Sequence, residues 1–350
     1  MAPAASPRVL VIGAGVVGLT TAVEIQRALP EAAVTIFAAQ TAEDLKSTRY
    51  TSSWAGAHHV TLEGPGLQRD CEVDTFKALW ALAHDDPSVP LLVCPQTEVF
   101  EDASKADFMR KNLSSFMPDV KPLEPSALPE GCTAGLSFTT IALDTPNYLP
   151  WLAQRFRAAG GTVVRRELGK LSDAPLDEFD AVVNCSGLGA LTLVGDDSMY
   201  PIRGQTVLVR APWIRSGITR SGSDNWTYII PRKQGDVIVG GTRGIDDWHE
   251  QPRPETASEI LARGLKLCPA LLPEAKRASM RVEDIDVVEH GCGFRPARKG
   301  GVRIELDHVA APDGRSLPLV HNYGHAGAGF QMSIGSATRA VDLLRSALAS

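Results

Sequence analysis

The sequence predicts an α/β protein in which a parallel-sheet domain is interleaved with an α+β domain built on a mostly antiparallel sheet. The first indication is a strand, a glycine turn and a helix that follow one another near the N-terminus. The second is a group of β-rich runs within residues 200–294, separated by turn residues, which is typical of antiparallel strands. The third is length, because 350 residues exceed the usual size of one hydrophobic core and favour two domains.

The first unit of the chain has the pattern of a Rossmann-type βαβ element. The apolar run Val9–Ile12 predicts a buried strand, and Gly13-Ala14-Gly15-Val16-Val17-Gly18 follows it directly. A helical pattern and a second strand over residues 33–37 come next. In this motif one glycine permits the tight turn, one lets the backbone approach a pyrophosphate, and one allows the helix to pack closely on the strand. Together with the free N–H groups of the helix start, this pattern predicts a dinucleotide site.

Two features of the same region bear on other interpretations of this motif. The acidic residue that usually follows the second strand and binds ribose hydroxyls is missing, because the sequence reads Ala38-Ala39-Gln40 there. This gap counts against an ordinary NAD site. Arg8 and the uncharged run 9–23 also have the layout of a secretory signal, but a signal requires neither glycines at this spacing nor a second strand.

The α/β pattern returns after an interruption. Residues 60–143 show little helical periodicity and contain many prolines, so we expect an inserted or separate module there. From Tyr148 a helical pattern runs to Gly160-Gly161, and a strand starts at residue 162. A buried strand ends in the small-residue turn Ser186-Gly187, where a ligand can contact the backbone. A last glycine-rich turn, 324–329, precedes a C-terminal helix.

Composition excludes several classes of function. The net charge is −6 without a lysine or arginine run, so we expect no nucleic-acid partner. Hydrophobic residues make up 44% of the chain, but no apolar segment is long enough to span a bilayer, so we expect no membrane association. The six cysteines are scattered without a CxxC pair, which favours reduced thiols. The adjacent pair His58-His59 lacks a third ligand at useful spacing, so we predict no metal site.

Several motifs along nearly the whole chain resemble the FAD-dependent D-amino acid oxidases, a family that includes the D-aspartate oxidases. They are the N-terminal motif 11–19, Val183-Asn184-Cys185-Ser186-Gly187, Pro201-Ile202-Arg203-Gly204-Gln205, Tyr228-Ile229-Ile230-Pro231-Arg232, Gly240-Gly241-Thr242-Arg243 with Trp248, Gly293-Phe294-Arg295-Pro296-Ala297-Arg298, and residues 320–331. The resemblance implies FAD as cofactor, oxidation of an amino acid by O2, and hydrogen peroxide as product. A sarcosine- or glycine-oxidase-like flavoprotein shares the N-terminal motif, but the motifs around Tyr228, Arg295 and His321 argue against it.

The resemblance also assigns catalytic roles. Arg295 is similar to the family arginine that binds the substrate α-carboxylate in a two-pronged pair, which a planar guanidinium favours. Tyr228 is similar to the tyrosine that donates its hydroxyl to the same carboxylate. The reaction needs the Cα–H aimed at flavin N5, so positioning is the main demand. The family uses no side-chain base, and we nominate none.

Substrate choice depends on Arg243. This position resembles the one at which D-aspartate oxidases carry arginine, so the sequence predicts oxidation of acidic D-amino acids, D-aspartate to oxaloacetate. The alternative is a D-amino acid oxidase for neutral substrates, with Arg243 paired to Asp246, Asp247 or Glu250 and facing solvent. His58 could contact the distal carboxylate or merely pack in its loop.

The resemblance further implies which residues bind FAD and how the chain divides. We expect an FAD-binding domain over residues 1–57, 144–196 and 295–350, and a substrate-binding domain over 58–143 and 197–294. The predicted FAD contacts are Gly13, Gly15, Val16, Val17, Gly18, Ser52, Ser53, Gly56, Ala57, Leu168, Ser186, Gly187, Arg295, Ala326, Gly327, Gly329, Phe330 and Gln331.

Location and assembly are less determined. Peroxide chemistry favours a peroxisomal or cytoplasmic enzyme, although the chain as given ends without the Ser-Lys-Leu signal. A homo-oligomer is compatible with the sequence.

Overall fold

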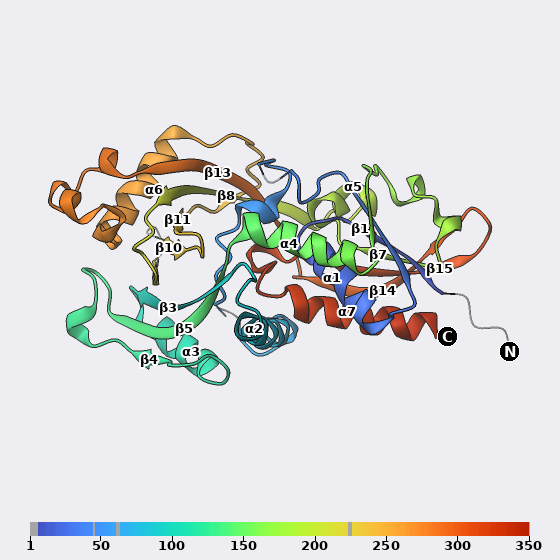
Figure 1. Ribbon diagram of the computed structural model, residues 1–350, viewed down its shortest axis with the longest axis horizontal. Helices are drawn as coiled ribbons and strands as arrows, with labels where there is room; N and C mark the ends of the chain where they lie inside the picture. Colours follow the sequence, from blue (N-terminus) through green and yellow to red (C-terminus); the bar gives the residue numbers. More distant parts are fainter. Residues whose placement is uncertain (1–5, 45, 61–63, 223–225, 350) are drawn as a thin grey trace.

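The molecule is built around two β-sheets that lie side by side (Figure 1). The computed structural model describes residues 6–44, 46–60, 64–222 and 226–349. One sheet, together with α1 (Val16–Ala28) and α7 (Ser333–Leu348), occupies the right of Figure 1, where both termini also lie. The other sheet occupies the left.

The first sheet is mostly parallel, as the N-terminal pattern predicts. Within the described residues it has six strands in the order β14-β15-β7-β1-β2-β6. All neighbouring pairs are parallel except β14 with β15. The strands are β1 (Arg8–Ile12), β2 (Ala33–Ala38), β6 (Thr162–Arg165), β7 (Ala181–Asn184), β14 (Arg303–Ala310) and β15 (Ser316–Tyr323).

Strand β1 is apolar on both faces because both faces are covered. Val9 and Val11 pack in the core that contains α1, α4 (Thr145–Ala158) and α7. Leu10 and Ile12 face the opposite side, where the segment around residues 171–193 covers them. A continuous apolar run is what a parallel strand buried on two sides requires.

The glycine turn after β1 is as tight as the motif predicts. Gly13 has φ of +107°, and a Cβ there would lie 2.4 Å from the carbonyl oxygen of Cys185. A Cβ on Gly18 would lie 2.0 Å from the carbonyl oxygen of Gly13. Glycine is therefore required at both positions for the helix to pack on the strand.

The second sheet is mostly antiparallel, which confirms the prediction for residues 200–294. In the part of the chain that the structure describes, its nine strands run β12-β8-β11-β10-β9-β3-β5-β4, with β13 paired to the other edge of β8. Only β3 and β9 pair in parallel. The strands are β3 (Leu91–Phe100), β4 (Lys121–Pro122), β5 (Ala134–Leu143), β8 (Met199–Arg210), β9 (Gly217–Ser221), β10 (Thr227–Pro231), β11 (Asp236–Gly240), β12 (Gly244–Ile245) and β13 (Val287–Arg298).

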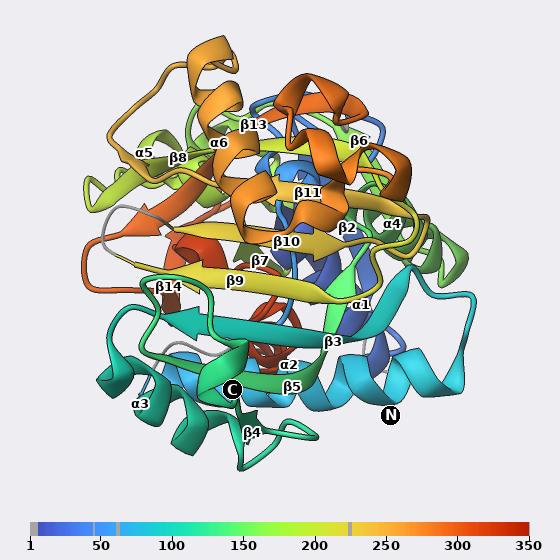
Figure 2. The same ribbon diagram turned by 90° about the vertical axis from the view of Figure 1, so that its left-hand side faces the viewer.

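Helices cover this second sheet at two places (Figure 2). Helix α6 (Pro254–Leu267) lies in front of β10 and β11 and buries Ile260 and Leu265 against Val239. Helices α2 (Leu67–Asp85) and α3 (Ala103–Leu113) lie near β3 and β5, at the bottom of Figure 2. The short helix α5 (Ala190–Leu193) follows the turn after β7. No helix within the described residues is long and apolar enough to cross a membrane.

Helices α2 and α3 are the main departure from the sequence-based expectation for residues 60–143. The weak periodicity has a structural cause, because α2 buries the polar residues Glu72 and Thr75 beside Cys71 and Phe76. The Thr75 hydroxyl accepts a hydrogen bond of 2.9 Å from the backbone N–H of Gly335 in α7. A Cβ on Gly335 would lie 2.3 Å from the carbonyl oxygen of Cys71, so the two helices cross closely. The buried side of α2 therefore contacts a backbone and does not present a purely apolar stripe.

Strand β13 links the two sheets. It pairs with β8 from Val287 to Arg298 and thus passes through the predicted boundary at residue 295. Ala297 also forms an isolated bridge to His325, which follows β15 of the parallel sheet. The division of the chain into two domains at these residues remains a prediction.

Candidate active site

A cavity of about 890 Å³ lies where elements of both sheets meet. The glycine turn after β1, the loop 49–58 and the turn 326–331 contribute to its wall. Strands β8, β10 and β13 contribute from the antiparallel sheet. Its size is typical of a site for a large cofactor or ligand.

One stretch of the wall is made by the start of α1. Gly15 is the N-cap residue and provides no side-chain cap, so the first-turn N–H groups are open to other acceptors. The N–H of Val16 donates to the Ser52 hydroxyl at 3.0 Å. Nearby, the hydroxyl oxygen of Ser186 is buried and has no hydrogen-bond partner among the described residues. A buried hydroxyl of this kind in a cavity wall favours a polar ligand.

A neighbouring stretch is made by the turn that precedes α7, where a Cβ on Gly329 would lie 3.8 Å from the Val16 side chain. Ala326, Gly327, Ala328, Gly329, Phe330 and Gln331 all line the cavity. Ala326 has φ of +47°, and Ala57 on the facing loop has φ of +56°. A left-handed alanine is strained, and such strain concentrates where backbone must face a ligand. The Gln331 amide donates to the carbonyl oxygen of His58 at 3.2 Å and joins the two segments.

Two arginines and two aromatic residues gather in the wall formed by the antiparallel sheet. The guanidinium carbon of Arg243 lies 4.3 Å from the centre of the Trp226 ring, and that of Arg295 lies 5.7 Å from the same ring. The rings of Trp226 and Tyr228 are 4.8 Å apart in an edge-to-face arrangement. Both cations thus lie within cation–π range of one aromatic ring, which contributes about 0.5–2 kcal/mol for each cation.

The position of Arg295 depends on a glycine and a carbonyl. Its guanidinium lies flat over Gly204 of the paired strand β8, where a Cβ would come within 2.6 Å of three guanidinium atoms. Its Nη1 donates to the carbonyl oxygen of Thr242 at 2.9 Å. The guanidinium also hydrogen-bonds to the Tyr228 hydroxyl, and the rest of its fork is available for an anionic ligand.

Tyr228 is buried and is also framed by glycines. It is 4% exposed and lies opposite Gly240 in the ladder between β10 and β11. A Cβ on Gly240 would lie 2.2 Å from the ring, and one on Gly241 would lie 2.4 Å from the hydroxyl oxygen. Burial raises the pKa of the Tyr228 hydroxyl, although the positive charges of Arg295 and Arg243 oppose this shift. The hydroxyl is therefore protonated at neutral pH and able to donate a hydrogen bond.

Arg243 lacks an ion pair with any residue that the structure describes. Of the carboxylates downstream, Asp247 is engaged by Arg253 through contacts of 2.6 and 3.1 Å. Burial and the neighbouring charge of Arg295 lower the pKa of the Arg243 guanidinium, which stays charged at neutral pH. Its exposed surface faces the open cavity that it lines. Two uncompensated cations in one cavity wall favour an anion there.

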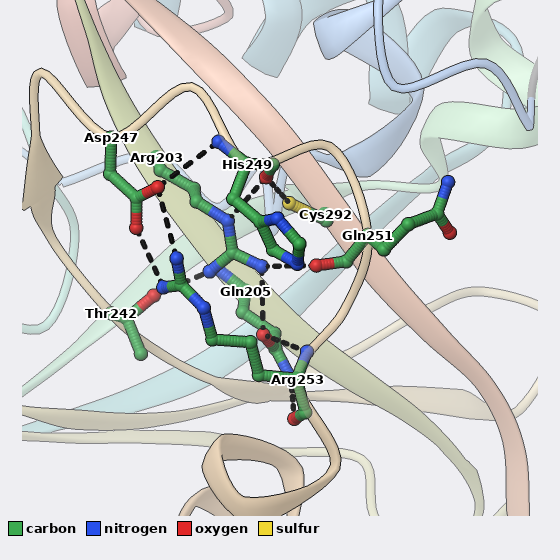
Figure 3. Close-up of polar contacts among 8 residues, drawn as sticks. All are labelled: Arg203, Gln205, Thr242, Asp247, His249, Gln251, Arg253 and Cys292. Carbon is green, nitrogen blue, oxygen red and sulfur yellow. Dashed lines mark hydrogen bonds and ion pairs between the residues drawn. The ribbon is translucent and has the colours of Figure 1, made fainter.

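The loop that carries Arg243 is held by a buried network (Figure 3). Arg203 of β8 is 2% exposed and donates to the carbonyl oxygens of His249 and Gln251 at 2.7 and 2.6 Å. Gln205 exchanges two hydrogen bonds with the backbone of Arg253, at 2.8 and 2.9 Å. Its own N–H donates to the hydroxyl of Thr242, the residue whose carbonyl orients Arg295. The network thus connects the backbone of the loop to both pocket arginines.

His58 lines the cavity, but its ring lies near a carboxylate of the protein itself. Its Nε2 lies 3.7 Å from Oε1 of the buried Glu98 on β3. A contact between His58 and a substrate remains a prediction. Among the described residues, no group of three or more His, Cys, Asp or Glu side chains is arranged to hold a metal ion.

The structure brings nearly all the predicted site residues to one cavity. Gly18 and Ser53 are the exceptions, because neither lines the wall. Gly18 packs against Gly13, and the Ser53 hydroxyl donates to the carbonyl oxygen of Tyr50 at 2.8 Å. The lining residues among the predictions are Gly13, Gly15, Val16, Val17, Ser52, Gly56, Ala57, His58, Leu168, Ser186, Gly187, Tyr228, Arg243, Arg295, Ala326, Gly327, Gly329, Phe330 and Gln331.

Trp226 is the most important residue that sequence reasoning missed. A signal for it existed, because Trp226, directly before β10, alternates with Tyr228 and Ile230 of that strand, and all three line the cavity. Successive side chains of a strand point to opposite faces, so the face of Tyr228 includes residue 226.

The residues present fit FAD. The glycine turn lies in the cavity wall, the N-cap residue of α1 provides no side-chain cap, and the buried Ser186 hydroxyl has no partner among the described residues. The residues that would hold it are those of the turn 13–17, the loop 52–57 and the turn 326–331.

Comparison with known proteins agrees with this fit. A D-aspartate oxidase from Talaromyces thermophilus is 35% identical over 366 residues, covering 97% of this chain and 95% of the relative. A D-amino-acid oxidase from Schizosaccharomyces pombe is 34% identical over 343 residues, covering 96% and 95%. The solved structure of a glycine oxidase from Bacillus cereus shares the fold, with a TM-score of 0.73 at 18% identity and coverage of 97% and 95%. The model of the FAD dependent oxidoreductase family matches residues 8–343. The chain therefore belongs to the FAD dependent oxidoreductase family and uses FAD as its cofactor.

Proposed function

We propose that this protein is a D-aspartate oxidase, which converts D-aspartate, O2 and water to oxaloacetate, ammonia and hydrogen peroxide. The observation that carries the proposal is the pair of arginines on Trp226, neither of which is neutralised by a carboxylate among the described residues. Relatives that carry the name D-aspartate oxidase support it. A relative that carries the name D-amino-acid oxidase supports the broader activity.

Each of the two arginines would bind one of the two carboxylates of the substrate. Arg295, held over Gly204 with one N–H on Thr242, presents its remaining donors to the α-carboxylate. The protonated Tyr228 hydroxyl adds a donor to the same group. Arg243, whose guanidinium lies closer to the same Trp226 ring, then takes the distal carboxylate. Two fixed points hold the substrate in a single orientation, which is the main requirement for transfer from Cα.

FAD, when bound, would supply the redox chemistry as the acceptor of a hydride from the substrate Cα. The chain contributes orientation and charge and no general base. The substrate amine loses its proton before the transfer, and water then hydrolyses the imino acid to the keto acid and ammonia. O2 would take up the two electrons together with two protons and become hydrogen peroxide.

Selectivity for an acidic substrate follows from two effects: the attraction of its distal carboxylate to Arg243, and the cost of leaving Arg243 unpaired when the substrate is neutral. A charge-assisted hydrogen bond to the distal carboxylate stabilises the complex by about 1.5–3 kcal/mol, and a neutral side chain leaves Arg243 unpaired. The net charge of −6 repels a dicarboxylate at long range, so the attraction must come from these local cations.

The deciding experiment is anaerobic bleaching of the flavin by D-aspartate, L-aspartate, D-alanine and D-glutamate. We expect D-aspartate to reduce the wild-type flavin fastest. In Arg243→Met we expect kcat/KM for D-aspartate to fall by roughly 10- to 150-fold, with D-alanine turnover unchanged or improved.

Arg263→Met is the matched control. Arg263 donates to the carbonyl oxygen of Gly241 at 3.4 Å, close to Arg243, but does not line the cavity. The Arg263→Met substitution should leave the preference for D-aspartate over D-alanine unchanged. Rapid reduction of wild type by D-alanine, with no loss of D-aspartate activity in Arg243→Met, would instead identify an oxidase of neutral D-amino acids.

A further inference from the structure

The end of β2 lacks the carboxylate that Rossmann-type sites place there. β2 ends at Ala38, and Ala39 and Gln40 follow it in the cavity wall. An acidic residue at this point ordinarily accepts hydrogen bonds from the ribose hydroxyls of the adenosine half of the cofactor. The ribose of FAD therefore needs another acceptor in this protein.

The neighbouring strand brings a carboxylate to the same edge of the sheet. β6 pairs in parallel with β2, so that Arg165 lies opposite Ala38. The N–H of Arg166 donates to the carbonyl oxygen of Ala38 at 2.9 Å, which extends the pairing beyond the end of both strands. Glu167 comes next and lines the cavity together with Ala39 and Gln40. Because the strands are parallel, their carboxyl ends meet at one edge, where ligands bind.

The side chain of Glu167, which is 63% exposed, pairs with an arginine in the same wall. Nη2 of Arg49 lies 2.6 Å from Oε1 of Glu167, and both residues line the cavity. Oε2 of Glu167 takes part in no hydrogen bond with any residue that the structure describes. A carboxylate can accept from an arginine on one oxygen and from a hydroxyl on the other.

The other polar groups nearby are less suited to the task. The Arg166 guanidinium carbon lies 5.2 Å from the centre of the Phe37 ring, so this cation stacks on an aromatic face. Gln40 has a neutral amide, whose hydrogen bonds to hydroxyls are weaker than those of an ionised carboxylate.

We propose that Glu167, from the segment after β6, replaces the missing acidic residue of β2 and accepts hydrogen bonds from the adenosine ribose hydroxyls of FAD. This inference concerns the cofactor alone and does not depend on which amino acid the enzyme oxidises.

The test measures the affinity of the protein, stripped of its flavin, for two ligands. One is FAD, and the other is an FAD analogue whose adenosine ribose lacks both the 2′- and the 3′-hydroxyl group. The readout is quenching of flavin fluorescence, without any amino acid substrate. Glu167→Gln should raise the Kd for FAD by roughly tenfold or more and change the Kd for the analogue by less than about twofold.

Two further variants distinguish the possible causes of weaker FAD binding in Glu167→Gln. Glu43→Gln is the matched control, because Glu43 also pairs with a surface arginine, Arg157, at 2.9 Å but does not line the cavity. The Glu43→Gln variant should bind FAD and the analogue with the same Kd values as wild type. Gln40→Ala should raise the Kd for FAD less than Glu167→Gln does.

Three results would overturn the proposal. In the first, Glu167→Gln binds FAD as tightly as wild type. In the second, it weakens FAD and the analogue equally, which would show that Glu167 only supports the fold or Arg49. In the third, the loss specific to the ribose hydroxyls appears in Gln40→Ala and is absent from Glu167→Gln.

Discussion

Individual residues set the chemistry of this cavity through close contacts that leave little choice of side chain. Arg295 can lie flat against β8 because residue 204 has no Cβ, and Tyr228 can fill its place because residues 240 and 241 have none. Glycine is required at these positions because the side chains packed against them leave no space for a Cβ. These glycines would look like ordinary strand or turn glycines in the sequence alone.

Gly204→Ala should displace Arg295 with little effect on the fold. The added Cβ would lie 2.6 Å from the guanidinium, which is the far end of a flexible side chain and can move away. Loss of its contact with Thr242 and with substrate should lower kcat/KM by roughly 10- to 150-fold, mainly through KM. Steady-state kinetics and thermal unfolding of the FAD-loaded enzyme measure the two effects.

Gly64→Ala provides the comparison for this substitution. A Cβ on Gly64 would meet its nearest neighbour at 3.6 Å, an ordinary contact. Its kinetics should match those of wild type. Wild-type kinetics in Gly204→Ala would show that Arg295 does not bind substrate in the position described.

At the scale of elements, strand β8 has two functional faces. Tyr200, Ile202, Gly204 and Thr206 alternate toward the cavity. Arg203 and Gln205 face away and hold the segment 249–253 by its backbone (Figure 3). The strand therefore shapes the cavity on one side and fixes the loop that follows Arg243 on the other.

Arg203→Met should loosen this loop more than it destabilises the protein as a whole. It removes the arginine donor from the part-buried carbonyl oxygens of His249 and Gln251, of which His249 keeps only the weak thiol donor of Cys292, at a cost of about 1 kcal/mol for each lost hydrogen bond. Amide hydrogen exchange of residues 246–253 should accelerate, and KM for substrate should rise because Thr242 and Arg243 are attached to the same network. Exchange followed by mass spectrometry measures the first effect.

Arg210→Met on the same strand is the matched control. Arg210 forms an ion pair with Asp236 at 3.0 Å, and its side chain is 53% exposed. Such a surface pair contributes about 0–1 kcal/mol, so exchange in the loop should stay at the wild-type rate. If Arg203→Met left that rate unaltered as well, the buried arginine would not be what holds the loop.

At the scale of the whole molecule, the core contains histidines that are neutral when the protein is folded. Burial lowers the pKa of His59 to about 3 and that of His325 to about 4. Unfolding returns both toward the ordinary pKa of about 6.5. The unfolded chain therefore binds more protons than the folded protein at mildly acidic pH, and stability falls as pH decreases through this window.

The free energy of unfolding should consequently decrease between pH 6 and pH 5 by about 1.4 kcal/mol per pH unit for each of these histidines. Urea unfolding at saturating FAD measures the slope. His59→Gln should reduce the slope by one histidine's share. His308→Gln, at an exposed position, should leave it unchanged, and an equal slope in His59→Gln and wild type would contradict the assignment.

The sequence by itself determined the features that depend on local pattern. The βαβ unit, the glycine turn and the β-rich runs of the second sheet were predictable, because strand and helix periodicity and motif spacing are properties of neighbouring residues. Most of the predicted site residues do line the cavity, but it was the resemblance to a family that singled out residues such as Tyr228, Arg243 and Arg295. Helix α2 was not predictable in this way, since it buries polar side chains against the backbone of α7.

Only the tertiary structure decided which distant side chains act together. Trp226 lies under both arginines because β10, β11, β8 and β13 pair in a particular register. Glu167 stands beside Gln40 because β6 pairs with β2, although 126 residues separate Arg165 from the Ala39 carbonyl that it contacts. Strand pairing places such residues in one wall, and the chain carries no local pattern that records it. The physical reason is that register and sheet order arise from long-range hydrogen bonding and packing, which no window along the sequence contains.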